Sequence, residues 1–476
     1  MGFWTDDSAG LLFLFHLHGF ADLARYSAKP ATAAGDAFWG DVISSWLGEC
    51  GRPSRPAWHP FPLSGRVVAW SGALSRGGWD PDLAAAMLAA LPPQLTLLRR
   101  SVEHDIGGNH VLRNATALVI GGICTGDGRT ERAGLDLLER ELTRQLLRDG
   151  GHEERSTSYQ RAILGDLEDV VATLLQASRP VPAWLAAAVT AMRRWLEALT
   201  GPDGRLPLLN DAWEGSPLDR VQDEALTDLM DSGYVVLRAG ADQAVLDVGP
   251  VAPPHLPPHA HADVLSFVLW ADGHRIVVDP GSYSYSGPER GRFRGTAAHS
   301  TVEIDGRDQC DLWGPFRAAH MPNVSRGALE VIGDAITLTA EHDGYTRLPD
   351  PVVHRRTFCW LPGDGLVVID RLLARNTHRA RTRLPLAPGL VTDGRSAGPL
   401  RVLALGPGPP PMAKDGAYSP FLGRQVPASV IRRDLSCEPG VPFGWALVRP
   451  GTDVTLNDGV LAVERPGREP LRLVPG

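Results

Sequence analysis

The sequence changes character near residue 230, and this change constrains the fold more than any other feature. Before it, apolar residues recur at the spacing of amphipathic helices; after it, short runs of β-branched residues alternate with turn residues. Helices in one half and strands in the other form separate domains, because a parallel βαβ fold needs the two kinds of element to alternate. A length of 476 residues also exceeds one ordinary core. We predict a helical domain over residues 1–225 and an antiparallel β domain, most simply a sandwich, over residues 226–476.

Proline and glycine mark the ends of the helices predicted in the first half. Asp80-Pro81 provides an N-cap followed by proline at the first helical position, and Pro92-Pro93 predicts the end of that helix. Another helix is predicted from Pro182 to Thr200, because its apolar residues share one face and Gly201-Pro202 follows. Repeated amphipathic helices joined by short loops indicate a bundle, a solenoid or a toroid. Further helical segments are predicted at residues 115–120 and 135–147.

Short runs rich in β-branched residues predict antiparallel strands in the second half. Asp272-Gly273 lies between two of these runs and is a strong hairpin signal, since both residue types tolerate the positive φ of a tight turn. Asp305-Gly306 marks the end of another run. The predicted strands cover residues 234–237, 244–246, 265–270, 275–278, 301–304, 336–340, 357–360 and 366–369.

Charge, cysteine content and the N-terminal residues exclude several classes of protein. The formal net charge of −8 argues against a general nucleic-acid-binding protein, and an acidic substrate would need a locally basic site. The five cysteines contain no Cys-x-x-Cys pair, so neither a disulfide framework nor a thiolate zinc site is expected. The apolar stretch 11–15 is short and lacks a basic leader, so we expect neither a signal peptide nor a membrane span. The sequence as written predicts a cytoplasmic protein, or a periplasmic or secreted one if the true start lies upstream.

The segment from His259 to His299 carries the richest chemistry. Side chains two apart on a strand point to the same face, so His259 and His261 can share one site. His261, Asp279 and His299 come from three neighbouring segments, and histidine with carboxylate suits a zinc-like divalent ion. The spacing fits hydrogen-bonded histidines at strand ends equally well, so both interpretations stay open.

Other histidines do not share this pattern. His16 and His18 lie in a predicted helix, where side chains two apart diverge by about 200° and do not readily share a metal. His255 and His274 are expected in loops or at the surface, without a functional role.

The helical half offers polar residues suited to an anionic ligand. Asn109 and His110 precede an apolar stretch and are expected near a helix N-terminus, where donors and the positive dipole suit a carboxylate. If the segment around Tyr159 is helical, Arg155 lies one turn before it and would lower the pKa of the phenol from about 10, as a base requires. A capping role for Asn109 and a core position for Tyr159 are the alternatives.

Asp211 and Trp213 lie at the predicted domain junction, where clefts are common, and are candidates for substrate contact. Arg155 and Arg294 are further candidates, among several arginines that could make a locally basic site. For any one arginine, a solvated surface charge is the alternative. The wider set is Arg99, Arg100, Arg113, Arg155, Arg290, Arg292 and Arg294.

At these residues the sequence resembles the heparinase II/III-like family of polysaccharide lyases, which includes heparin and alginate lyases. The resemblance covers most of residues 10–310, and its blocks are specific together although each is weak alone. Beyond about residue 345 only a β-rich tail is similar. The matching blocks are Leu17-His18-Gly19-Phe20, residues 108–112, 149–159, 259–267, Asp279-Pro280-Gly281 and residues 296–306.

The resemblance implies an N-terminal (α/α) toroid, a C-terminal antiparallel β-sandwich and an active site between them. The chain begins almost at the first matching block, so we expect an incomplete toroid without the early helices of many relatives. The implied partner is an acidic glycan or oligosaccharide, with no nucleic acid or membrane partner; a homodimer is compatible with the sequence. The implied cofactor is one zinc ion that orders the site.

The same resemblance implies β-elimination of a uronate-containing glycan. Asn109 would bind the uronate carboxylate, with help from His110, which is also a candidate base. Tyr159 would act as base and acid or as acid alone, and His259 would be the catalytic histidine of the sandwich. The implied zinc ligands are His261, Asp279 and His299.

Two other functions stay open. A glycoside hydrolase would need two carboxylates that face the scissile bond, for which Asp105 and Asp211 are the candidates. A non-catalytic glycan-binding or assembly protein would keep the pocket without turnover.

Overall fold

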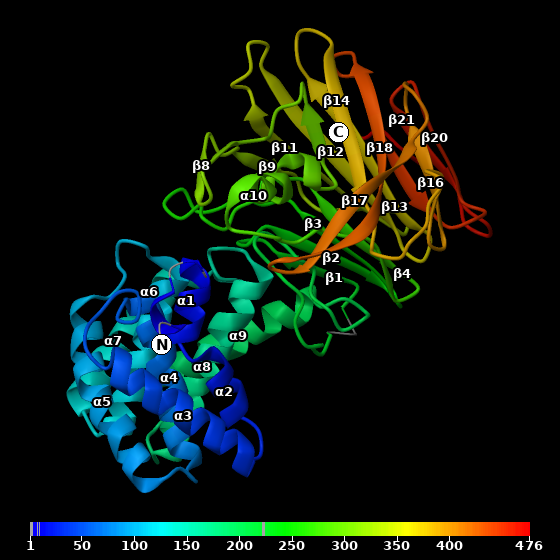
Figure 1. The fold of residues 1–476 in the computed structure, drawn as a ribbon. Coiled ribbons are helices and arrows are strands. Elements are labelled where there is room, and N and C mark those ends of the chain that lie inside the picture. The colour runs from blue at the N-terminus through cyan, green and yellow to red at the C-terminus, as the bar shows by residue number, and fades with distance from the viewer. Residues whose placement is uncertain (1–2, 7, 9, 221–223) are drawn as a thin grey trace. The chain divides into compact units, whose positions relative to one another are not determined.

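The computed structural model describes residues 3–6, 8, 10–220 and 224–476, and in these the helices precede the strands (Figure 1). The chain divides into two compact units, Met1–Leu146 with Ala162–Thr190, and Leu147–Arg161 with Ala191–Gly476. The order of helical and antiparallel β structure confirms the predicted fold class. The boundary between residues 225 and 226 stays a prediction; the first strand begins at Leu226.

The first unit is built from helices whose apolar faces pack on one another. Two glycines let neighbouring helices approach closely: a Cβ on Gly122 would lie 2.5 Å from the Glu131 nitrogen, and one on Gly134 would lie 2.6 Å from the Val119 nitrogen. The helices are α1 (Leu11–His18), α2 (Ala21–Ser27), α3 (Ala33–Cys50), α4 (Pro60–Arg76), α5 (Pro81–Arg100), α6 (Gly108–Thr125), α7 (Gly128–Gln145), α8 (Thr157–Gln176) and α9 (Ala183–Leu199), after the 3-10 turn Phe3–Thr5. The start of α8, up to residue 161, and the end of α9, from residue 191, belong to the second unit.

One helix boundary was predicted wrongly. Helix α5 does not stop before Pro92 but continues through Pro92 and Pro93 to Arg100. Each proline removes one backbone hydrogen bond, a cost of about 3 kcal/mol in a helix interior. Both prolines are exposed, so water can reach the carbonyls that they leave unpaired, while the opposite face buries Met87, Leu91, Leu95 and Leu98. Burial of that apolar face outweighs the local break signal.

The strands of the second unit pair antiparallel throughout the named sheets. A five-stranded sheet has the order β1-β2-β3-β4-β5, a larger sheet has the order β10-β11-β12-β13-β19-β16-β15 with β9 on β11, and a third has the order β17-β18-β14-β6. Their bounds are β1 (Leu226–Leu229), β2 (Tyr234–Ala239), β3 (Asp242–Asp247), β4 (Phe267–Ala271), β5 (His274–Val277), β6 (Val302–Ile304), β9 (Val324–Arg326), β10 (Glu330–Ile332), β11 (Ala335–Tyr345), β12 (Val352–Leu361), β13 (Gly365–Leu373), β14 (His378–Pro385), β15 (Ser396–Ala397), β16 (Leu400–Leu405), β17 (Met412–Phe421), β18 (Arg424–Cys437) and β19 (Phe443–Val448).

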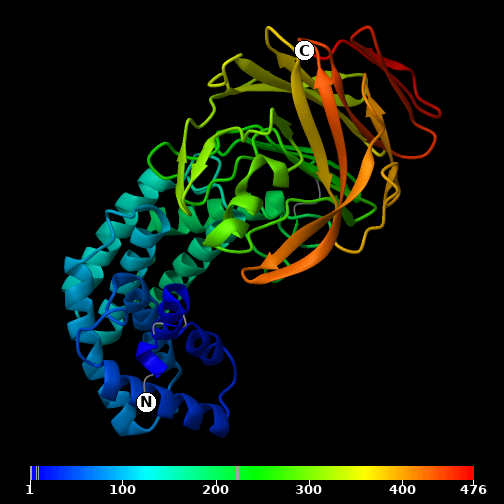
Figure 2. The ribbon, with the colours of Figure 1, turned by 45° about the horizontal axis from the view of Figure 1, so that its top comes forward.

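The remaining elements of this unit are short. A single helix, α10, lies in the loop between β5 and β6, and the long β17–β18 hairpin projects from the sheets in orange (Figure 2). The short elements are α10 (Gly287–Arg294), the 3-10 turn η3 (Thr296–Ala298), β7 (Asp311–Trp313), β8 (Arg317–Ala319), β20 (Asp453–Asn457), β21 (Val460–Glu464) and β22 (Leu471–Leu473).

The predicted strand pattern is confirmed where turn chemistry and hydrophobicity agree. Asp272 and Gly273 both have positive φ, 50° and 79°, and close the predicted β4–β5 hairpin. The core between the sheets buries large apolar side chains, among them Phe358, Trp360 and Trp445. This core supports three loops that carry polar residues: residues 248–266, residues 278–286 and the segment that ends at His299. Within the described residues, no helix has both the length and the apolar character needed to cross a bilayer.

Candidate active site

Asp211 is the centre of a buried hydrogen-bond network in the second unit. Its Oδ2 lies 2.9 Å from Nδ1 of His259, and its Oδ1 lies 3.1 Å from Nε2 of His261. Arg290 donates to both carboxylate oxygens, through Nη2 to Oδ2 at 2.8 Å and through Nη1 to Oδ1, and Ser282 donates to Oδ1 at 2.8 Å. Burial alone would raise the pKa of Asp211, but the Arg290 charge and the two histidine hydrogen bonds hold it well below its usual range.

Backbone contacts place Asp211 beside the histidine loop. Its amide donates to the His259 carbonyl at 3.1 Å, and its own carbonyl accepts from the Ser156 hydroxyl at 2.5 Å. Asn210, with φ of 58°, accepts from the His261 amide at 3.0 Å. His259 and His261 therefore contact the same carboxylate. They lie in a loop, because β4 begins only at Phe267, so the strand geometry predicted for them is wrong.

Tyr159 lies in the first turn of α8, against this network. Its hydroxyl is 2.9 Å from the Tyr285 hydroxyl, and the centroid of its ring is 4.0 Å from that of His259. Trp213 contacts the same ring edge-on, with centroids 5.7 Å apart. Burial and the Asp211 charge raise the pKa of Tyr159 above its usual value, so its phenol carries a proton at neutral pH.

Arg155 does not have the effect on Tyr159 that its spacing predicted. Helix α8 begins at Thr157, and Arg155 has φ of 54°, so the two residues are not one helical turn apart. The Arg155 guanidinium instead donates to the Ser232 carbonyl at 3.1 Å. The predicted lowering of the phenol pKa is therefore wrong, because burial dominates and Arg155 points to the backbone.

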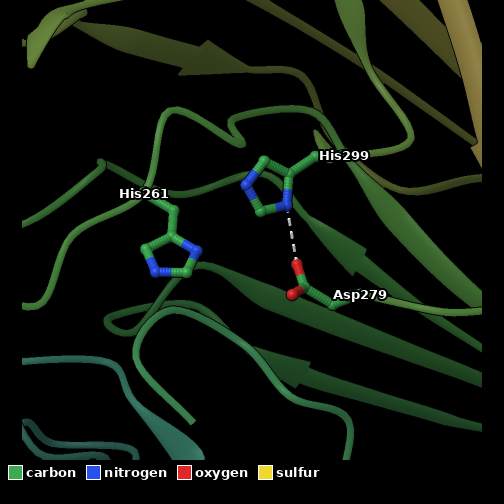
Figure 3. Close-up of side chains that lie close together, drawn as sticks. All are labelled: His261, Asp279 and His299. Atoms are coloured by element: carbon green, nitrogen blue, oxygen red, sulfur yellow. Dashed lines mark hydrogen bonds and ion pairs between the residues drawn. The ribbon is translucent and has the colours of Figure 1, made fainter. Parts of the chain in front are cut away.

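Three residues beside this network could hold a metal ion. His261, Asp279 and His299 each offer one ligand atom, and these atoms lie within 4.8 Å of one another (Figure 3). Nδ1 of His299 lies 2.8 Å from Oδ2 of Asp279; burial alone would lower the pKa of His299, but this carboxylate raises it. Among the described residues, Nδ1 of His261 and Nε2 of His299 have no hydrogen-bond partner although both are buried. Such orphaned nitrogens fit a metal-binding role.

The contact between His261 and Asp211 also fits a metal site. A histidine that ligates a metal usually donates its other ring N–H to a carboxylate, which fixes the ring and its tautomer. Here Nε2 of His261 contacts Asp211 and Nδ1 is left for an ion. The donor set of two imidazoles and one carboxylate suits zinc.

In the first unit, Asn109 and His110 lie in the first turn of α6, as predicted. The turn that precedes them uses positive φ at Gly107 and Gly108, 76° and 53°. Nδ1 of His110 lies 3.1 Å from a carboxylate oxygen of Glu103. His110 is half-buried.

The histidines expected to have no metal role are engaged elsewhere. His18 is buried, where its Nε2 contacts the Trp4 carbonyl at 2.9 Å and its Nδ1 accepts from the Trp46 indole at 3.1 Å. His255 is exposed and pairs with the buried Glu153 at 3.3 Å.

The substrate contacts predicted for Arg155, Arg294, Asp211 and Trp213 stay predictions. The first three are buried, and Arg294 donates through Nε to the Ala260 carbonyl at 2.8 Å, between the two site histidines. Trp213 is half-buried beside Tyr159.

Sequence reasoning missed Tyr285 and Ser282 and gave Arg290 no individual role. Arg290 also lies over the Tyr285 ring, 5.2 Å from its centroid, so one guanidinium contacts both the carboxylate and the tyrosine. The run Ser282-Tyr283-Ser284-Tyr285 directly follows Asp279-Pro280-Gly281. Polar aromatic residues next to a candidate metal ligand were the available signal.

Comparison with known proteins identifies relatives of both halves of the chain. The family model for the heparinase II/III N-terminus matches residues 39–227, and the model for the heparinase II/III-like C-terminal region matches residues 221–444. A heparin-sulfate lyase from Bacteroides stercoris is 22% identical over 396 residues, which are 72% of this chain and 55% of that protein. FtsZ-localized protein C from Caulobacter vibrioides is 28% identical over 333 residues, 64% of this chain and 56% of that protein. The chain thus spans a little over half the length of these curated relatives.

Solved structures with the same architecture include lyases. A crystal structure of heparinase III gives a TM-score of 0.77 at 17% identity, covering 96% of this chain and 82% of that one. A chondroitin AC lyase from Streptomyces coelicolor, in complex with chondroitin sulphate, gives 0.58 at 14% identity, covering 97% and 79%. At such identities the likeness shows the fold: an (α/α) toroid followed by an antiparallel β domain.

Proposed function

Because the chain belongs to the heparinase II/III-like family, we propose that it is a polysaccharide lyase that cleaves a uronate-containing glycan by β-elimination. The observation that carries this proposal is the contact of Tyr159 with both Tyr285 and His259, where His259 is in turn bound to a buried carboxylate. It places a proton donor next to a candidate base. The names of the relatives, a heparin-sulfate lyase and a chondroitin AC lyase, support the same reaction class.

In this proposal, Tyr159 supplies a proton and His259 removes one. The raised pKa of Tyr159 keeps its phenol protonated, as a donor to the departing glycosidic oxygen must be. Asp211 holds Nδ1 of His259, which leaves Nε2 of the ring as the proton acceptor. Tyr159 as both base and acid, and His110 as base, are the alternatives carried over from the family resemblance.

The proton next to a carboxylate is weakly acidic until the charge of that carboxylate is neutralised. We assign this task to Asn109, with His110 beside it at the start of α6, where the helix dipole favours an anion. Asp211, which is fully buried and accepts from four side chains, positions His259 in this proposal.

We assign a zinc ion to His261, Asp279 and His299, on the strength of their spacing and the two orphaned imidazole nitrogens. When bound, the ion would supply positive charge and would hold its three ligands in place. His261 contacts Asp211, and His259 lies two residues earlier, so the ligands fix the loop that carries the proposed base.

A glycoside hydrolase fits the geometry less well. Hydrolysis needs two carboxylates with access to the scissile bond. Asp211 is saturated by Arg290, Ser282 and the two histidines, so it lacks the free carboxylate oxygen that this role requires. A non-catalytic protein is the second alternative, and turnover decides between them.

The test is incubation with a panel of uronate glycans while the ultraviolet absorbance of unsaturated uronate ends is followed. We expect this absorbance to rise with the wild-type protein and to be abolished by Tyr159→Phe, which keeps the ring contacts and removes the acidic proton. Tyr283→Phe is the matched control, since its ring stacks on Phe293, and it should retain activity. New reducing ends without the absorbance would establish hydrolysis. If no glycan in the panel gives either signal, the proposal of an enzyme is refuted.

A further inference from the structure

A cavity of about 260 Å³ lies in the second unit at the tip of the β17–β18 hairpin. Polar side chains from three separate segments line it, together with alanine, proline and valine. The hairpin is the long orange ribbon of Figure 2. The lining side chains used below are Arg205, Glu214, Arg275, Tyr418, Phe421 and Arg424.

The cavity carries an excess of positive charge. Its lining holds three guanidinium groups and one carboxylate, that of Glu214. Arg205 contacts one oxygen of Glu214 at 2.6 Å, and Arg275 contacts the other at 3.0 Å. The Tyr418 hydroxyl donates to that second oxygen at 2.9 Å, so Glu214 is held as an anion by three partners.

Arg424 is the arginine of this lining that has no carboxylate partner among the described residues. Arg275 has a second carboxylate partner, Asp203 at 3.2 Å, and Arg205 is satisfied by Glu214. Arg424 is exposed at the turn of the hairpin, opposite Phe421, and makes no ion pair with any residue in the described parts of the chain. A guanidinium fork in this position matches the geometry of a carboxylate or a sulfate.

An exposed aromatic ring accompanies this charge. Phe421 is 43% exposed at the same turn. An aromatic face next to an arginine suits a sugar ring that carries an anionic group, because the ring packs on the face while the anion meets the guanidinium.

The cavity is joined to the tyrosine pair by short covalent and backbone links. Glu214 follows Trp213, whose ring contacts Tyr159, and the Glu214 amide donates to the Pro420 carbonyl at 2.8 Å. On the other side, the Gly423 amide donates to the Tyr283 carbonyl at 2.7 Å, two residues before Tyr285. These links place the cavity on segments that adjoin those of Trp213 and Tyr285 within the second unit.

We propose that this cavity is a subsite that binds a carboxylate or sulfate group of the glycan through Arg424, at a sugar other than the one that Tyr159 protonates. This inference rests on the proposed function for the identity of the ligand, but it concerns binding and is measured without turnover. Recognition of a second anion along the chain would select a glycan that is acidic at more than the cleaved unit.

The test is calorimetric binding of size-defined uronate oligosaccharides to the full-length protein carrying Tyr159→Phe. Adding Arg424→Gln should raise the Kd about tenfold, the usual effect of losing one hydrogen-bonded charge. Arg375→Gln is the matched control, an exposed arginine outside the cavity, and should leave Kd unchanged. Desulfated and carboxyl-reduced oligosaccharides identify the recognised group, since the effect of Arg424→Gln should vanish with the ligand that lacks it.

The outcomes separate the two proposals. Equal Kd values for Arg424→Gln and Arg375→Gln would overturn the subsite, even if the wild-type protein releases unsaturated products. Arg424-dependent binding without cleavage of any glycan would support the subsite and refute the lyase. If no oligosaccharide binds, both proposals fail.

Discussion

Replacing Asp211 by asparagine tests the buried network on which the candidate site is built. The change keeps the size of the side chain and removes its charge, so Arg290 is left as a buried cation without its counter-ion. Breaking a buried ion pair by removing one partner costs about 3–5 kcal/mol, because the remaining charge is not solvated. For a unit of this size that loss corresponds to a fall in melting temperature of about 5–15 °C. Loss of the carboxylate that holds His259 should also lower kcat by about a hundredfold or more.

A matched control separates burial from the mere presence of partners. Asp311 also contacts one histidine and one arginine, His320 at 2.7 Å and Arg347 at 3.0 Å, but its side chain is 49% exposed. Asp311→Asn should cost less than about 1 kcal/mol, because water screens exposed pairs. Thermal unfolding followed by near-ultraviolet circular dichroism measures both variants. Equal shifts for the two variants, or a shift below about 2 °C for Asp211→Asn, would refute the reasoning.

Three further predictions concern metal, pH and packing. Removing metal with a chelator should lower the melting temperature of the second unit, and added zinc should restore it. In Asp279→Asn, neither chelator nor zinc should change the melting temperature. Purified protein without stoichiometric metal would contradict the assignment. Burial and the neighbouring charges of His354 and Arg356 hold the pKa of His342 well below its usual value, so only the unfolded chain gains this proton as the pH falls below about 6.5. The free energy of unfolding should therefore fall by at most about 1.4 kcal/mol per pH unit through this group. In His342→Gln, the melting temperature should depend less on pH between about pH 6.5 and about pH 5. Gly122→Ala should destabilise the first unit by about 1–3 kcal/mol, because its Cβ would meet the Glu131 backbone. The control, Gly165→Ala, has open space around it and should be neutral or stabilising. Chemical denaturation measures the free energy of unfolding of both variants.

The fold class could be predicted because local patterns and global architecture agree over most of the chain. The Asp272-Gly273 hairpin and the helix that ends before Gly201-Pro202 formed where turn chemistry indicated. Helix α5 is the exception: two prolines signalled an end, but they face solvent while the other face of the helix is buried. The apolar spacing of Met87, Leu91, Leu95 and Leu98 is visible in the sequence, but whether burial of that face outweighs two prolines depends on tertiary packing.

The candidate site could be predicted in its residue types but not in its connections. The spacing of His259, His261, Asp279 and His299 predicted a shared region, and the structure brings these residues together. The role of Asp211 as the common partner of His259 and His261 could not be predicted, because it lies 48 residues before His259 and is joined to it only by folding. The pKa of Tyr159 was predicted in the wrong direction for a related reason: the sequence shows a nearby arginine but not the burial of the phenol.

The central claim, cleavage by elimination, is tested most directly by digesting a uronate glycan in water labelled with heavy oxygen. The masses of the products are then measured by mass spectrometry. Elimination uses no water in bond cleavage, so we predict one unsaturated product and no incorporation of the label beyond the exchange seen in a control without protein. The Tyr159→Phe variant should yield no product under the same conditions. Saturated products that carry one labelled oxygen at each cleavage would show hydrolysis and contradict the account.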